Sequence, residues 1–201
     1  MLGPMARPRT FDLEQVLDGA MALFRERGYE GTSVPDLTSE LGICRQSLYN
    51  SFGDKRGLYL EALERYGKVE VDSKLGLLSA EGSPLENVRT VVRGLAAMAT
   101  SCPGEGCLTV TAMVETREDP GALEAVERHV ERLEGGFRGA LTAAKEAGEL
   151  RPAARPERLA RAIITSIYGI GVLSRLPSSG PRIADAVSVL IGLLDDAASE
   201  G

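Results

Sequence analysis

The chain has 201 residues, of which 43% are hydrophobic and 26% are charged, and these values are typical of a globular protein with a substantial core. No apolar run approaches the ~18 residues of a membrane-spanning helix, and the first ten residues lack the apolar core of a secretory signal. The formal net charge of −6 argues weakly against a nucleic-acid partner, and the odd number of cysteines, three, indicates a reducing cytoplasm.

Hydrophobic residues recur at helical spacing along the whole chain, and no stretch alternates as a strand would. The first predicted helix covers about residues 12–27. A short helix then begins at Ser33, which forms a capping box with Asp36, and ends at Gly42, where a left-handed turn costs little. The next short helix covers residues 44–52, and Asp54 caps a further helix over 55–71.

After a break at Gly82, Ser83 and Pro84 begin a helix that ends before the Pro- and Gly-rich loop at 101–106. The remaining helices are predicted at about 107–117, 119–147, 156–176 and 183–198, with a possible kink at Gly135 and Gly136. The sequence therefore predicts an all-α fold of about nine helices.

The helix at 44–52 places Leu48 and Phe52 on one face at i, i+4 spacing, and its other face is polar. A tight turn before such a helix is the layout of a helix-turn-helix, whose second helix enters the DNA major groove. Residues 1–60 hold seven Lys and Arg against eight Asp and Glu, but residues 43–58 carry three cations and only Asp54 as an anion. Arg7 and Arg9 belong to a predicted basic arm over residues 1–10.

The run TSVPDLTSELGICRQSLYNSFGDKRGL, residues 32–58, resembles the DNA-binding region of the tetracycline-repressor-type (TetR) family of transcriptional regulators. The motifs are T-S-V-x-D-L, L-G-I at the turn, S-L-Y and F-G-D-K-x-x-L, and the resemblance covers about residues 10–65. It implies that Arg45, Gln46 and Ser47 read bases. The side chains it implies for phosphate or other DNA contacts are Thr32, Ser33, Tyr49, Asn50 and Lys55. Ser51 departs from the family, which usually has a bulky His or Tyr there.

The same resemblance implies a DNA-binding domain over 1–57 and an effector-binding and dimerisation domain over 58–201, in a protein of the bacterial cytosol or nucleoid. The two last helices, about 156–198, are apolar around much of their circumference and are expected to form a four-helix bundle with a second copy, unless both bury within one subunit. The predicted interface residues are Ile163, Ile167, Ile170, Val187, Leu190, Ile191 and Leu194.

The middle of the chain is then the sensor, where an unknown small molecule would shift the protein away from its DNA-binding state. The residues that could line its pocket are Met98, Cys107, Thr111, Met113, Glu115 and Tyr168. The segment GCLTVTAMVE also resembles a Gly-Cys-Leu motif of family branches that sense oxidants or electrophiles, so Cys107 with Cys102 could be a thiol sensor, or Cys107 could be a small buried hydrophobe.

Catalytic and metal-binding chemistry have little support in the sequence. His129 is the only histidine and is expected on a solvated face, beside Glu127 and Arg128. No nucleotide-binding or hydrolase motif occurs, so we expect neither an enzyme nor a cofactor nor a metal site. The sequence predicts a dimeric repressor released from a palindromic operator by an effector. A helical binding protein that keeps the head only as a scaffold remains the alternative.

Overall fold

The computed structural model describes residues 12–101, 106–115 and 118–199, without the side chains of residues 96 and 98–101. Within these ranges the regular structure is helical, apart from one isolated bridge between Leu150 and Ala198. The all-α prediction is confirmed. No helix in the described ranges is long and apolar enough to cross a bilayer.

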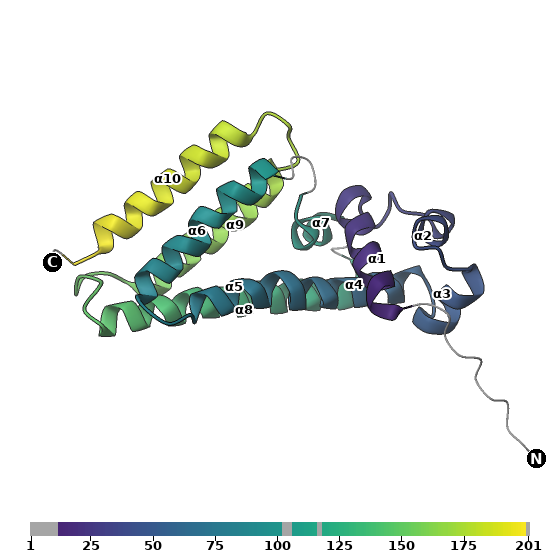
Figure 1. The fold of residues 1–201 in the computed structure, drawn as a ribbon, viewed down its shortest axis with the longest axis horizontal. Helices are drawn as coiled ribbons and strands as arrows, with labels where there is room; N and C mark the ends of the chain where they lie inside the picture. The colour runs from purple at the N-terminus through teal and green to yellow at the C-terminus, as the bar shows by residue number, and fades with distance from the viewer. Residues whose placement is uncertain (1–11, 102–105, 116–117, 200–201) are drawn as a thin grey trace, which may run out of the picture.

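The N-terminal helices α1 (Leu13–Arg27), α2 (Val34–Glu40) and α3 (Arg45–Phe52) form a head at one end of the molecule (Figure 1). A long rod leads away from the head and consists of α4 (Lys55–Tyr66), the π-helical segment η1 (Gly67–Val71) and α5 (Asp72–Leu78). The rod runs without interruption to Leu78, seven residues beyond the predicted end at 71, and passes through one π-helical segment at Gly67–Val71.

The body consists of α6 (Pro84–Ser101), α7 (Leu108–Glu115), α8 (Pro120–Glu146), α9 (Pro156–Leu173) and α10 (Gly180–Ala197). Figure 1 shows α8 alongside the rod, with α6, α9 and α10 leaning together away from it. Gly136 allows the close passage of α5 over α8, because a Cβ at this position would overlap a methyl group of Leu75 and lie 3.2 Å from Leu78 Cδ1. The helix α8 continues unbroken through Gly135 and Gly136.

Two hydrophobic cores hold these parts together. One lies under α1–α4 and receives Leu108 and Ala112 from α7, so the head and α7 share a core. The other lies among α5, α6, α8, α9 and α10. Because α7 contributes to the core of the head, its position and that of the head depend on each other.

The predicted dimer residues need a correction, because the single chain already buries most of them. Ile163 is 2% exposed and Leu194 is 1% exposed, and Ile191 is only half-buried. The others are also buried in the body core: Ile167, Ile170, Val187 and Leu190. Their apolar faces turn inward because α9 packs on α8 and α10 packs on α6. The exposed large apolar side chains of these helices are instead Val172, Val189 and Leu193, with Leu176 in the turn between them.

Candidate DNA-binding surface

The corner that aims α3 is built from local interactions. Ser33 Oγ accepts a hydrogen bond from the Asp36 backbone N–H at 3.2 Å, and Asp36 Oδ2 accepts one from the Ser33 N–H at 2.9 Å. Hydrogen bonds to this carboxylate, first from the Ser33 hydroxyl and then from the Ser33 N–H, hold the pKa of Asp36 below its usual value. Gly42 turns the chain with φ of 63°, a conformation that favours glycine, and Ile43 fills the corner. The capping box and the turn are both confirmed.

The helix α3 is buried on one side and exposed on the other, as its sequence predicts. Leu48 and Phe52 pack into the head, and the outer side chains form two i, i+4 pairs. Arg45 Nη2 donates to Tyr49 Oη at 3.2 Å, and Gln46 Nε2 donates to Asn50 Oδ1 at 2.9 Å. These pairs present a row of polar groups suited to base edges and phosphate oxygens.

Two of the predicted DNA-contact residues have other partners. Thr32 is fully buried and its Oγ1 donates to the Gly28 carbonyl at 2.6 Å, so its hydroxyl closes the α1–α2 turn and is not available to a phosphate. Ser47 is half-buried and its hydroxyl lies 3.2 Å from Cys44 Sγ. The hydrogen bond to Ser47 lowers the pKa of the exposed Cys44 thiol. Ser33 stays exposed, although its hydroxyl also caps α2.

The two cations at the start of α4 are held differently. The Lys55 ammonium lies 4.1 Å from the centre of the Tyr29 ring. Arg56 forms a bidentate ion pair with Asp119, with Nε–Oδ2 at 2.6 Å and Nη2–Oδ1 at 2.8 Å. The pKa of the Asp119 carboxyl is lowered, chiefly by this hydrogen bond. Lys55 therefore remains the cation of α4 suited to a phosphate, while Arg56 ties the head to the start of α8.

The helix α7 joins the head to the body and places three of the predicted pocket residues at this junction. Glu115 is exposed at the seam, where its Oε2 accepts the Tyr29 N–H at 2.7 Å. Thr111 Oγ1 accepts a hydrogen bond from Arg175, whose Nη2 also donates to the Arg25 carbonyl at 3.0 Å. Met113 packs against the head core. All three lie at the head because α7 is short and packs on α1.

A polar cleft of about 600 Å³ opens along the same seam. Its lining includes Tyr29, Arg56, Glu115 and Asp119, so both ties between the head and the α7–α8 corner lie at its wall. Tyr29, Arg175 and Asp119 were not identified as site residues from the sequence. Their hydrogen-bond partners are at least 63 positions away along the chain. A local sequence pattern does not indicate a contact over such a separation.

Cys107 and Tyr168 are both half-buried in the body, where polar side chains form two hydrogen-bonded pairs. Tyr66 Oη donates to Cys107 Sγ at 3.4 Å, and Thr109 Oγ1 lies 3.3 Å from His129 Nδ1. Burial raises the pKa of both Tyr66 and Tyr168, and proximity to Cys107 raises it further. The side chain of Met98 and all of Cys102 lie outside the described residues, as do Arg7 and Arg9.

His129 is not on a solvated face, as was expected, but is 2% exposed. Its ring fits against Gly67 at the start of η1, where a Cβ would overlap Nε2. Burial lowers the pKa of the imidazole, which is therefore neutral near pH 7. No group of three or more His, Cys, Asp or Glu side chains suited to a metal ion occurs in the described part of the chain.

A separate apolar groove of about 490 Å³ lies between α5, the start of α6 and α8, with Leu75, Leu78 and Pro84 among its walls. None of the predicted pocket residues lines this groove. An apolar groove of this size is within the range of small-molecule sites, but it lies at the far end of the rod from the head.

Known proteins resemble both halves of this architecture. A model of bacterial regulatory proteins of the tetR family matches residues 16–62, and a model of the tetracyclin repressor-like C-terminal domain matches residues 84–190. The uncharacterized HTH-type transcriptional regulator YezE of Bacillus subtilis is 34% identical over 194 residues, which cover 95% of this chain and 100% of YezE. The HTH-type transcriptional repressor ComR of Escherichia coli is 45% identical over 60 residues, 30% of this chain and 29% of ComR.

The solved structures include one that carries DNA. A cysteine-substituted variant of the TetR family transcriptional regulator CifR, complexed with a 26-base-pair operator, is 29% identical with a TM-score of 0.82. The match covers 93% of this chain and 98% of the CifR chain. The likeness therefore extends over the head and the body together.

Proposed function

Because the chain belongs to the TetR family of DNA-binding transcriptional regulators, we propose that it is a dimeric repressor that leaves a palindromic operator when an effector binds its body. Its function is regulation and not enzymatic catalysis. The proposed DNA-binding domain is residues 1–57, and the proposed effector-binding and dimerisation domain is residues 58–201. The proposed compartment is the bacterial cytosol, where the operator lies.

The observation that carries DNA binding is the polar outer face of α3 above the buried side chains Leu48 and Phe52. Arg45, Gln46 and Asn50 are exposed there, and Tyr49 is 37% exposed. We assign base contacts to Arg45 and Gln46, with Ser47 at the edge, and phosphate contacts to Tyr49 and Lys55. CifR was solved on operator DNA, which supports the same use of the head here.

A mobility-shift titration against the DNA that flanks the gene tests this assignment. Arg45→Ala is expected to weaken specific binding by about 1–3 kcal/mol per lost bidentate base contact. Arg138→Ala is the matched control, because it removes the same charge from an exposed position on α8, outside the head. Equal affinities of the two variants would remove Arg45 from the interface.

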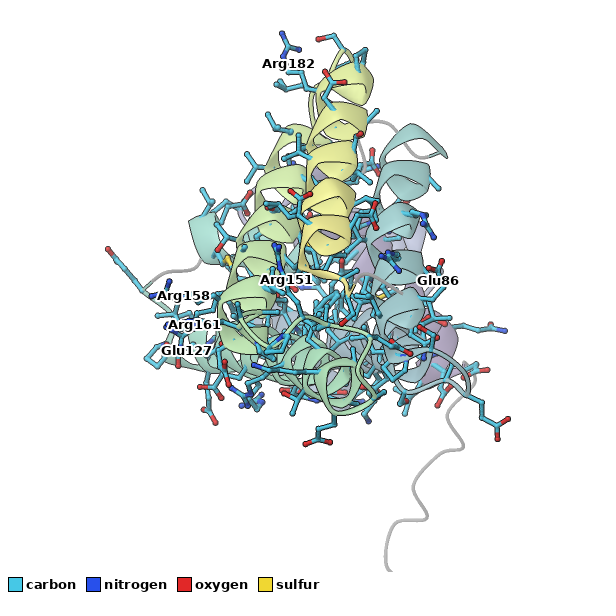
Figure 2. The ribbon with its side chains drawn as sticks, turned by 90° about the vertical axis from the view of Figure 1, so that its left-hand side faces the viewer. Glu86, Glu127, Arg151, Arg158, Arg161 and Arg182 are labelled. Carbon is cyan, nitrogen blue, oxygen red and sulfur yellow. The ribbon has the colours of Figure 1, made fainter. Side chains whose placement is uncertain are left out.

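The proposed dimer uses the outer face of α9 and α10. Val172 is 53% exposed, Val189 64% and Leu193 46%, so both helices expose large apolar side chains. Figure 2 shows Arg182 at the upper end of the molecule, near the start of α10, and Arg158 and Arg161 lower down, near the start of α9. A two-fold contact here would present two copies of α3 to half-sites about 34–36 Å apart.

Sedimentation of the pure protein tests the dimer. Val189→Glu with Leu193→Glu is expected to give monomers and to abolish cooperative operator binding, because each carboxylate would be buried at a two-fold contact. Val69→Glu is the matched control, since Val69 is 41% exposed but lies on the rod. A monomeric wild-type protein at micromolar concentration would exclude this arrangement.

A thiol-sensing repressor is the second candidate. Cys107 supports it, because its sulfur accepts a hydrogen bond from Tyr66 and adjoins the α9 residue Gly171. CifR was also studied as a cysteine-substituted protein. Cys107→Ser is expected to abolish release from DNA by peroxide or quinone if the thiol is the sensor. An unchanged response would leave the non-covalent effector as the trigger.

A further inference from the structure

Tyr29, in the turn after α1, contacts two functional elements at once. The Lys55 ammonium lies 4.1 Å from the centre of its ring, and its backbone N–H donates to Glu115 Oε2 of α7 at 2.7 Å. The ring itself is anchored, because its centre lies 6.3 Å from that of Phe24 and 4.7 Å from that of Tyr59. A fixed aromatic face thus lies between the body and the first cation of α4.

The approach of Glu115 depends on the glycine that precedes Tyr29. Gly28 has φ of 77°, and a Cβ at this position would overlap both carboxylate oxygens of Glu115. The neighbouring Arg56 is held by Asp119, four residues beyond Glu115. The α7–α8 corner therefore holds both the α1–α2 turn, which carries Tyr29, and the start of α4, which carries Lys55.

We propose that Tyr29 is a positioning residue for DNA binding: its ring holds the Lys55 ammonium in place for a phosphate, and Glu115 holds Tyr29. The proposal rests on the proposed function, which assigns the phosphate contact to Lys55. A free lysine side chain samples many rotamers, and stacking on a fixed ring restricts them before DNA arrives, so less ordering is needed on binding. If an effector displaces α7, the contacts of Glu115 with Tyr29 and of Tyr29 with Lys55 transmit the displacement to the Lys55 side chain.

A double-mutant cycle on operator affinity tests the ring. Tyr29→Leu is expected to weaken binding about two- to five-fold per head, the usual effect of an exposed cation–π contact. Tyr29→Phe keeps the aromatic face and the backbone N–H, and is expected to bind like the wild type. In a Lys55→Ala background, Tyr29→Leu is expected to have no further effect. Both Lys55→Ala and Tyr29→Leu should reduce the salt dependence of binding, by up to about 0.9 in log–log slope for each lost phosphate contact.

The Glu115 variants test the second contact without disturbing the packing of the head. Glu115 is exposed, so Glu115→Ala should leave the melting temperature of the protein unchanged but weaken operator binding as Tyr29→Leu does. Glu115→Gln keeps an oxygen that accepts the Tyr29 N–H and is expected to restore affinity. Comparison of Glu115→Ala with Glu115→Gln tests the positioning role of Tyr29 even if Tyr29→Leu loosens the packing of the head.

The outcomes separate this inference from the function on which it rests. If Lys55→Ala weakens binding while Tyr29→Leu and Glu115→Ala bind like the wild type, the positioning role is wrong and the DNA contact stands. Equal losses from Tyr29→Leu with and without Lys55 also refute the positioning role. If the wild type binds no DNA near its gene, or if Lys55→Ala has no effect on binding, the phosphate contact assigned to Lys55 is wrong. The positioning role of Tyr29 is then wrong as well.

Discussion

Replacing Gly67 with alanine should destabilise the body, because the new methyl group has no space. A Cβ at residue 67 would overlap His129 Nε2 and lie 2.8 Å from Cδ2. The ring cannot move outward freely, since it is 2% exposed and its Nδ1 lies 3.3 Å from Thr109 Oγ1. Contacts this short require the ring or the helix backbone to shift.

Two opposing effects set the size of the change. Overpacking a core by one methyl group costs about 1–3 kcal/mol. Removing a glycine from a helix interior returns up to about 1 kcal/mol. We therefore expect Gly67→Ala to lower the free energy of unfolding by about 1–2 kcal/mol, measured by urea denaturation at a fixed protein concentration because the proposed dimer makes stability concentration-dependent.

The His129→Ala background identifies the cause. Without the ring, alanine at residue 67 meets open space, and its cost should disappear. Gly94→Ala on α6 is the matched control, because a Cβ there meets no atom within 4 Å, and it should stabilise the protein by up to about 1 kcal/mol. A neutral or stabilising Gly67→Ala, or an equal cost in both backgrounds, would refute the steric argument.

Three further perturbations test other contacts. Ser33→Ala should lower the free energy of unfolding by about 1 kcal/mol, measured by thermal melts, because it removes the α2 cap. Ser33→Thr keeps a capping hydroxyl and should restore most of this stability. Equal melting temperatures of all three proteins would contradict the role of the cap. Asp119→Asn keeps the α8 cap but loses the ion pair with Arg56. The folded-state pKa of Asp119 is below the ordinary 3.8, so the stability it contributes is present above pH 3.8 and is lost as the pH falls through the lower folded value. The gap in urea midpoint between wild type and Asp119→Asn should therefore close in acid, and a pH-independent gap would exclude the ion pair as its cause. Arg175→Gln should loosen the head, because the guanidinium bonds to Thr111 and to a carbonyl near the end of α1 are lost. The measurement is amide hydrogen exchange, which should become faster in α1. Unchanged exchange would show that the stability of the head does not depend on Arg175.

Short-range features of the head could be predicted from the sequence. The Ser33–Asp36 capping box, the turn at Gly42 and the inward Leu48 and Phe52 all involve residues within four positions of one another. Such features depend on backbone geometry that neighbouring residues determine. The fold class, and the family through its motifs, followed from the same local patterns.

A buried position could also have been found for His129. It lies at helical spacing between Val126 and Leu133, both of which face the core of α8. Its charged neighbours along the chain do not share this face, because consecutive residues on a helix point in directions about 100° apart. The helical spacing therefore predicts the buried position of His129 better than its adjacent residues do.

Only the tertiary structure decided which partner each apolar or polar face meets. Periodicity indicated that α9 and α10 bury one side, but it did not distinguish a second subunit from the chain's own α8 and α6, and most of the predicted interface residues proved to be internal. The bonds from Tyr29 to Glu115 and from Arg56 to Asp119 join residues 86 and 63 positions apart. A contact at that separation is set by how whole helices pack, and packing depends on the shape of both partners, which a single stretch of sequence does not contain.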